Sequence, residues 1–185
     1  AVDREARVQM ALAKVGYPVP EIFGLCTDDA VIGTWFYVMG MVEGRIVWDA
    51  TFPDVSREER PKYFHAMNET LARLHKVDYA AVGLSDFGKP GNYFARQISR
   101  WTKQYKASET ESIEAMDKLL EWLPAHLPQN DETVLVHGDY RLDNLMFASS
   151  AGGYPVATVD WQTPGQGPAS ADVSYFMGAG PLPAD

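Results

Sequence analysis

The sequence has 185 residues, which is enough for one ordinary domain with a buried core. Hydrophobic residues make up 46% of it and charged residues 22%, as in a soluble globular protein. Its 16 Lys and Arg against 25 Asp and Glu give a formal net charge of −9, which argues against general binding to nucleic acid or to an anionic membrane.

Cys26 is the single cysteine of the sequence, so no internal disulfide can form and a reducing compartment is expected. No apolar run approaches the length of a membrane span, and the N-terminus lacks the basic-then-apolar layout of a signal peptide. The sequence therefore predicts a cytoplasmic protein with no membrane partner.

Helical spacing marks the first segment of the chain. Val8, Leu12 and Val15 would share one apolar face of a helix over residues 3–15. Gly16 can end this helix in a left-handed conformation, and the prolines that follow require an extended chain.

Two runs of β-branched and aromatic residues come next, at 22–27 and 31–42. Asp28 and Asp29 between them favour a turn, so the sequence predicts two antiparallel strands. The second strand leads into a glycine-containing connection at residues 39–44.

Ser56 and Glu59 have the spacing of a capping box at the start of a helix. This helix runs to about His75, which we expect to hydrogen-bond locally near the helix end. Its apolar stripe, typical of a core helix, consists of Tyr63, Phe64, Met67, Leu71 and Leu74.

Residues 93–105 form the next predicted helix, which Asn92 can cap. Its polar side is crowded with basic residues and is expected to be a solvated face; they are Arg96, Arg100, Lys103 and Lys106. A further helix follows and stops at Pro124, and Asp172 begins the last helical pattern of the chain.

The stretch 134–161 combines three short apolar runs with a polar loop. The first run, 134–136, ends in His137-Gly138-Asp139-Tyr140-Arg141-Leu142-Asp143-Asn144. The runs 145–147 and 156–159 are separated by a turn at Gly152-Gly153 and predict a small hairpin. This hairpin would bring Asp139, Asn144 and Asp160 together. The Gly- and Pro-rich residues 162–170 are expected to have no regular structure.

Asp139, Asn144 and Asp160 suit phosphoryl transfer. One carboxylate can accept the proton of an attacking hydroxyl, while an amide oxygen and a second carboxylate hold magnesium against nucleotide phosphates. For any one of these residues, the structural alternative is an Asp or Asn side chain that satisfies turn backbone. His137 could suggest a metal ligand or a hydrolase base, but no residues with zinc-site spacing accompany it.

The ordered set His-x-Asp-x-x-x-x-Asn, then a hairpin and Asp-Trp, resembles the catalytic and metal loops of the aminoglycoside phosphotransferase-like kinases. This resemblance implies an α+β, protein kinase-like fold that is mostly helical, with a partial antiparallel sheet in the N-terminal lobe. It also implies ATP and Mg²⁺ as cofactors, with Asp139 as catalytic base and Asn144 and Asp160 as magnesium ligands.

The same resemblance implies roles for residues outside the loops. Glu5 would pair with the lysine that holds the nucleotide phosphates, and the carbonyl of Gly40 and the amide of Val42 would bind adenine. His137 and Asp172 would support the catalytic loop, Asp172 by accepting hydrogen bonds from the loop backbone. The basic helix lies near the acceptor cleft in this family, so contact with an anionic substrate is an alternative to a solvated face.

By this resemblance, residues 1–44 form part of the N-lobe and residues 45–185 the C-lobe of a longer kinase, because a Gly-rich loop, a lysine strand and C-terminal helices are missing. Residues 43–49 resemble the kinase-like domains fused to acyl-CoA dehydrogenases. The expected partner is a small-molecule hydroxyl compound, for which aminoglycosides, choline-like alcohols, sugars and hydroxyacyl compounds all stay open. A nucleotide-binding pseudokinase and a metal-dependent phosphohydrolase are the alternative functions.

Overall fold

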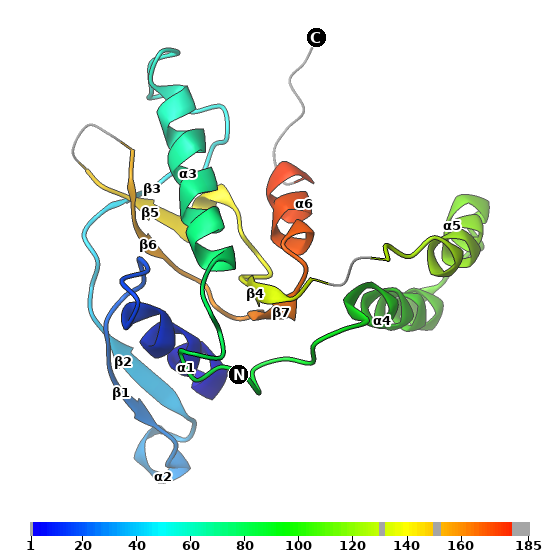
Figure 1. The fold of residues 1–185 in the computed structure, drawn as a ribbon, viewed down its shortest axis with the longest axis horizontal. Helices are drawn as coiled ribbons and strands as arrows, with labels where there is room; N and C mark the ends of the chain where they lie inside the picture. Colours follow the sequence, from blue (N-terminus) through cyan, green and yellow to red (C-terminus); the bar gives the residue numbers. More distant parts are fainter. Residues whose placement is uncertain (1, 130–131, 150–152, 179–185) are drawn as a thin grey trace.

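A computed structural model describes residues 2–129, 132–149 and 153–178 of the chain (Figure 1). It shows an α+β fold in which helices and short strands alternate along the chain. In order, the elements are α1 (Val2–Ala13), β1 (Ile22–Cys26), α2 (Asp29–Ile32), β2 (Phe36–Met39), β3 (Arg45–Ile46), α3 (Arg60–His75), α4 (Tyr93–Ser108), α5 (Glu114–Ala125), β4 (Val134–Val136), the 3₁₀ helix η1 (Leu142–Asn144), β5 (Leu145–Phe147), β6 (Pro155–Thr158), β7 (Gly165–Gly167) and α6 (Ser170–Gly178).

The strands form small antiparallel sheets rather than one large sheet. β1 pairs with β2, β5 lies between β3 and β6, and β4 pairs with β7. The predicted hairpin of β5 and β6 is confirmed; the turn predicted at residues 152–153 lies partly outside the described residues. Within the described ranges, no helix has the length and apolar character needed to span a bilayer.

Helix α1 confirms the predicted N-terminal helix and packs against β1 and β2 (Figure 1). It ends at Ala13, however, and Val15 is 50% exposed, so this residue does not belong to the buried face. Gly16 has a φ of +69°, and the amide of Tyr17 donates to the carbonyl of Leu12 at 3.1 Å. The left-handed glycine therefore ends the helix as expected. Val8 and Leu12 are fully buried on the inner face of α1.

The second predicted strand is too long, because residues 29–32 form the short helix α2 instead. The side chain of Asp28 accepts a hydrogen bond from the amide of Ala30 at 2.9 Å, and Gly33 ends the helix with a φ of +87°. These two caps outweigh the β propensity of the apolar residues between them. Strand β2 then begins at Phe36, which pairs with Cys26.

Helix α3 is the predicted core helix, but it starts at Arg60 and Ser56 does not cap it. Glu59 occupies the cap position, and the hydroxyl of Ser56 donates to the Glu59 side chain at 3.3 Å. Pro61 fits the first turn of a helix, which fixes the start close to it. Phe64 is 39% exposed and so does not belong to the buried stripe.

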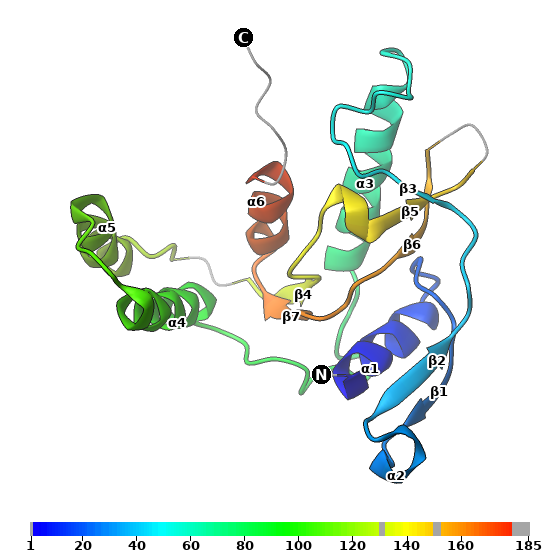
Figure 2. The ribbon, with the colours of Figure 1, turned by 180° about the vertical axis from the view of Figure 1, so that it is seen from behind.

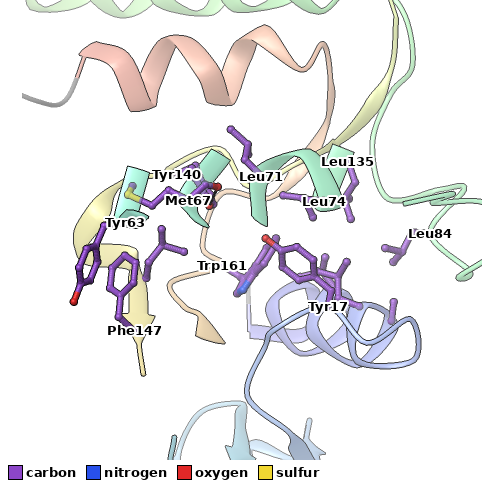
Figure 3. Packing of buried hydrophobic residues seen from close by; sticks show 14 of the residues in the cluster. Tyr17, Tyr63, Met67, Leu71, Leu74, Leu84, Leu135, Tyr140, Phe147 and Trp161 are labelled. Carbon is purple, nitrogen blue, oxygen red and sulfur yellow. Dashed lines mark hydrogen bonds between the residues drawn. The ribbon is translucent and has the colours of Figure 1, made fainter. Parts of the chain in front are cut away.

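One apolar cluster joins the elements predicted for the two lobes. Figure 3 shows Tyr17, which follows α1, beside Trp161, and the two rings meet edge to face at 6.2 Å between centroids. Trp161 is 1% exposed. Leu74 of α3 and Leu135 of β4 belong to the same cluster, so helix α1 and the C-terminal half share one core.

Helices α4 and α5 pack on each other and lie apart from α1 and α3 (Figure 2), while the ring of Tyr93 at the start of α4 packs close to Gly167 of β7. Neither buries a residue, and Trp101 and Trp122 are 60% and 54% exposed. Asn92 precedes α4 with a φ of +53° and makes no side-chain cap hydrogen bond, so the predicted cap is wrong. Pro124 lies in the last turn of α5, as expected for a residue that ends a helix.

The Gly- and Pro-rich segment after Asp160 contains regular structure, against expectation. Residues 165–167 form strand β7, and Gly165 pairs with Val136 at the end of β4. Because main-chain atoms alone make these hydrogen bonds, a segment without apolar alternation can still join a sheet. Strand β7 therefore lies beside β4, the strand from which the loop that begins at His137 starts.

Candidate active site

The polar loop starts where β4 ends, and Gly138 sets its path. Gly138 has a φ of +85°, and a Cβ atom there would lie 2.3 Å from the carbonyl oxygen of Thr163. A side chain at this position would meet both backbone strain and backbone atoms. The glycine therefore lets the loop pass close to the segment that follows Asp160.

Asp139 and Asn144 are in direct contact. The side-chain amide nitrogen of Asn144, Nδ2, donates to the backbone carbonyl of Asp139 at 2.9 Å and to the carboxylate oxygen Oδ2 of Asp139 at 2.8 Å. Asn144 is 7% exposed. The other carboxylate oxygen of Asp139, Oδ1, is buried and has no hydrogen-bond partner among the described residues. Such an oxygen is rare in folded proteins and points to a missing donor.

Asp160 lies beside Asn144 through the β5–β6 ladder. Leu145 pairs with Thr158, and the amide of Val159 donates to the carbonyl of Asn144 at 3.0 Å. Asp160 follows with a φ of +60° and an exposed side chain. The hairpin thus places Asp160 next to the Asp139–Asn144 pair, although the described hydrogen bonds do not join the Asp160 carboxylate to them.

His137 is fully buried and bonds the backbone on both sides of its ring. Its Nε2 lies 3.0 Å from the carbonyl of Val159, and its Nδ1 accepts from the amide of Asp139 at 3.3 Å. A ring that donates at Nε2 and accepts at Nδ1 is a neutral imidazole. Burial lowers the pKa of His137, which favours this neutral form, while the charge of Asp172 acts in the opposite direction.

Asp172 of α6 holds the start of the loop. Its fully buried carboxylate accepts hydrogen bonds from the amides of His137 at 2.9 Å and Gly138 at 2.8 Å. The hydrogen bonds expected from the loop backbone to Asp172 are therefore present. The same carboxylate lies 3.0 Å from Nε2 of His75 at the end of α3, so the local bond predicted for His75 is wrong. No local pattern indicates this pair, because the two residues are 97 positions apart.

Glu5 of α1 accepts a hydrogen bond from the hydroxyl of Tyr37 in β2 at 3.2 Å. Partial burial raises the pKa of Tyr37, and the negative charges of Glu5 and Asp160 add to this shift. The hydrogen bond from Tyr37 to Glu5 therefore joins strand β2 to helix α1. Tyr37 was not among the residues predicted for the site.

Gly40 and Val42 belong to the segment between β2 and β3. The amide of Gly40 donates to the carbonyl of Glu21 at 2.8 Å, which continues the pairing of β1 with β2. Gly44, further along, passes so close to β5 that a Cβ atom would lie 2.8 Å from the carbonyl oxygen of Phe147. The adenine contacts expected for Gly40 and Val42 stay predictions.

Arg4 joins α1 to the segment after Asp160. Its guanidinium donates to the carbonyl oxygens of Phe87 at 2.7 Å and Pro164 at 3.2 Å. The same group lies 4.1 Å from the centroid of the Phe87 ring, a favourable cation–π arrangement. Arg4 could not be predicted from the sequence, because its partners are backbone carbonyls far along the chain.

The site therefore combines a carboxylate whose buried oxygen has no partner among the described residues, an adjacent side-chain amide, and a second carboxylate on a residue with positive φ after strand β6. The arrangement of helices and small antiparallel sheets is the kinase-like fold of the aminoglycoside phosphotransferases. The profile of the phosphotransferase enzyme family matches residues 1–184, and the chain belongs to this family.

Solved structures agree with this assignment. A Ralstonia eutropha protein assigned to the aminoglycoside phosphotransferases is 51% identical, with a TM-score of 0.90; the match covers 95% of this chain and 54% of that one. An aminoglycoside 3′-phosphotransferase of type VIII is 21% identical, with a TM-score of 0.68, over 94% of this chain and 62% of its own. The protein kinase-like fold expected from the sequence is confirmed.

Among curated proteins, the chain is 46% identical to mouse acyl-CoA dehydrogenase family member 10 over 184 residues, or 100% of this chain and 17% of that protein. It is 44% identical to human acyl-CoA dehydrogenase family member 11 over 176 residues, or 95% of this chain and 22% of that protein. The resemblance of residues 43–49 to kinase-like domains of such proteins is confirmed. The chain spans about a fifth of the length of these relatives.

Proposed function

We propose that the complete protein transfers the γ-phosphate of ATP to a hydroxyl group of a small molecule. The observation that carries this proposal is the contact between Asn144 and Asp139. Because Asn144 holds the carboxylate through its amide nitrogen, its amide oxygen is left as a ligand for a cation. Oδ1 of Asp139 is left to accept a hydrogen bond from a hydroxyl group.

The donors fit Mg²⁺. An amide oxygen and a carboxylate are hard ligands, and Mg²⁺ is usually held by one or two carboxylates together with substrate phosphates. The described residues contain no group of three or more His, Cys, Asp or Glu side chains that could hold a metal ion. Asn144 and Asp160 would therefore share the ion with nucleotide phosphates. When bound, Mg²⁺ neutralises the charge that develops on the transferred phosphoryl group.

In the proposed reaction, Asp139 orients the acceptor hydroxyl for in-line attack and receives its proton. The hydroxyl oxygen bonds to the γ-phosphorus, the bond to the bridging oxygen breaks, and ADP leaves with the electron pair. Asp172 and His137 keep the loop in place through the hydrogen bonds described above. Catalysis then depends on positioning and electrostatic stabilisation rather than on a covalent intermediate.

The nucleotide contacts complete the proposal. Backbone groups of Gly40 and Val42 would bind adenine at the junction of residues 1–44, the partial N-lobe, with the C-lobe of residues 45–185. Glu5 would pair with the phosphate-binding lysine that the family carries before this helix. A solved structure of the same fold, APH(2″)-IIa, contains ATP and streptomycin in a ternary complex; it is 16% identical to this chain, with a TM-score of 0.65.

The test is ADP release by the full-length protein with MgATP and a panel of small alcohols, sugars and hydroxy acids. Asp139→Asn should lower the rate by roughly 10²- to 10⁴-fold. Asp143→Asn is the matched control, because this carboxylate lies in the same loop but pairs with Arg141. Acceptor-independent ADP release would indicate a phosphohydrolase. MgATP binding without turnover would indicate a pseudokinase, and absence of both would refute the nucleotide site.

A further inference from the structure

A second group of side chains borders the catalytic loop on the side of α4. A cavity of about 360 Å³ is lined by residues of α4, of the segment before it, of β7 and of the loop itself. Its basic lining residues are Lys89, Arg96 and Arg100, and none of its lining residues in the described part of the chain is acidic. We call this cavity the basic pocket. Its charge is opposite to that of the chain, which is −9.

The wall of the basic pocket is built by close backbone packing. A Cβ atom at Gly88 would lie 2.7 Å from the Cβ atom of Gln166, and one at Gly167 would lie 2.7 Å from the ring of Tyr93. These two glycines let α4 and the segment before it approach β7. Gln166, a lining residue, is 4% exposed, and its Oε1 is buried without a partner among the described residues.

The three basic residues differ in the contacts that their side chains make. Arg96 donates to the carbonyl oxygens of Gly91 and Lys89, the latter at 2.6 Å, and so fixes the turn before α4. Lys89 and Arg100 are exposed, and neither takes part in an ion pair found in the described ranges. Arg100 and Lys89 are therefore available to pair with a ligand, while Arg96 adds a fixed positive charge.

Gly138 and Thr163 connect the basic pocket to the proposed chemistry. Both line the pocket, and Gly138 immediately precedes Asp139. A ligand group held by Arg100 and Lys89 would thus leave the rest of the molecule beside the catalytic loop. A guanidinium binds carboxylate or phosphate through paired, charge-assisted hydrogen bonds, which gives orientation as well as affinity.

We propose that the phosphate acceptor is a hydroxyl compound with a carboxylate or phosphate group, which the basic pocket binds through Arg100 and Lys89. This proposal rests on the phosphotransferase function proposed above and adds the charge class of the substrate. Positive charges that line a cleft attract an anion and repel a polycation. A polycation such as streptomycin is therefore a poor fit for this pocket.

The experiment compares acceptors that share one three-carbon diol and differ in charge. ADP release by the full-length protein is measured with MgATP and glycerol, 3-amino-1,2-propanediol, glycerate or glycerol 3-phosphate. The expected result is a higher kcat/KM for one or both anionic acceptors than for glycerol and the amine. Comparison of glycerate with glycerol 3-phosphate separates carboxylate from phosphate recognition.

Variants of α4 assign the effect to the pocket. Arg100→Ser should raise KM for the anionic acceptors by roughly ten- to hundred-fold, with little change in kcat, because a charge-assisted hydrogen bond is lost. Arg100→Lys should recover part of this loss, since it keeps the charge but not the paired geometry. Lys103→Ser is the control, because Lys103 lies on the same helix but lines a different groove.

Preference for glycerol or the amine, or an equal effect of Arg100→Ser on all four acceptors, would overturn the anionic acceptor while leaving the phosphotransferase intact. If none of the four is phosphorylated, inorganic phosphate is titrated into the protein with saturating MgADP by NMR. Binding that is weakened about ten-fold or more by Arg100→Ser supports the pocket, and lack of binding overturns it. Loss of MgATP binding would instead count against the proposed function itself.

Discussion

Replacement of Asp172 by Asn tests whether this buried carboxylate holds the catalytic loop. The substitution keeps the shape of the side chain but removes its charge and one acceptor oxygen. In the structure, Oδ1 accepts from the amide of Gly138, while Oδ2 accepts from the amide of His137 and from Nε2 of His75. Whichever way the new amide turns, at least one of these buried donors faces an NH₂ group.

A buried donor left without an acceptor costs about 1–3 kcal/mol, and hydrogen bonds to a neutral oxygen are about 1 kcal/mol weaker than those to a charged one. We therefore expect Asp172→Asn to lower the free energy of unfolding by roughly 2–5 kcal/mol, a large part of the ~5–15 kcal/mol typical of a domain. His75→Ala removes one of the three donors and should cost roughly 1–3 kcal/mol.

Urea unfolding of the full-length protein, followed by tryptophan fluorescence, measures these changes. The His75→Ala, Asp172→Asn double variant should be less destabilised than the sum of the single variants by about 1 kcal/mol or more, because both remove the same contact. Asp117→Asn, which changes an exposed carboxylate paired with Lys106, is the control and should have little effect. Additive single effects, or an Asp172→Asn change below about 0.5 kcal/mol, would refute this account of the loop.

Three further predictions concern the same region. Gly138→Ala should destabilise the protein by roughly 2–4 kcal/mol in chemical denaturation, because of the clash with Thr163 and the positive φ; Gly165→Ala, which has open space around its Cβ position, should not. Because burial lowers the pKa of His137 from its usual 6.5, its contribution to stability is complete above that pH. This contribution should be lost as the pH falls through the lowered pKa, so that the free energy of unfolding decreases by up to about 1.4 kcal/mol per pH unit. Urea titrations at several pH values measure this decrease, which should be smaller in His137→Gln because glutamine does not titrate. Trp161→Ala should cost roughly 3–5 kcal/mol by urea titration, since the ring is buried in the core.

Local sequence signals predicted the elements that local forces decide. The apolar runs around Asn144 and before Asp160 gave the β5–β6 hairpin, because two short strands joined by a turn have few other ways to pair. Gly16 ended α1 as predicted, since few other residues adopt its φ of +69° without strain. The order of Asp139, Asn144 and Asp160 predicted a phosphotransferase site, and the catalytic and metal-binding roles of these residues stay predictions.

Contacts between distant segments could not be predicted from the same signals. Hydrophobic periodicity shows which face of a helix is buried, but not which residue meets its polar end. The pair of His75 with Asp172 and the pairing of β7 with β4 are of this kind. The prediction at helix α2 was wrong for a different reason. The caps Asp28 and Gly33 are local signals, but the β-branched residues around them favoured a strand.

The N-terminal helix is tied by a hydrogen bond to the segment that follows Asp160. Arg4 donates to the carbonyl of Pro164, four positions after Asp160, while the neighbouring Glu5 accepts a hydrogen bond from the hydroxyl of Tyr37. Burial raises the pKa of Tyr37, and the negative charge of Asp160 contributes to this shift. The segment after Asp160 is thus held by α1 on one side and by β4, through β7, on the other. A shift of α1 must therefore either move Pro164 with it or break the hydrogen bond between Arg4 and Pro164. This arrangement links the helix that carries Glu5 to the loop that carries the proposed metal ligand Asp160.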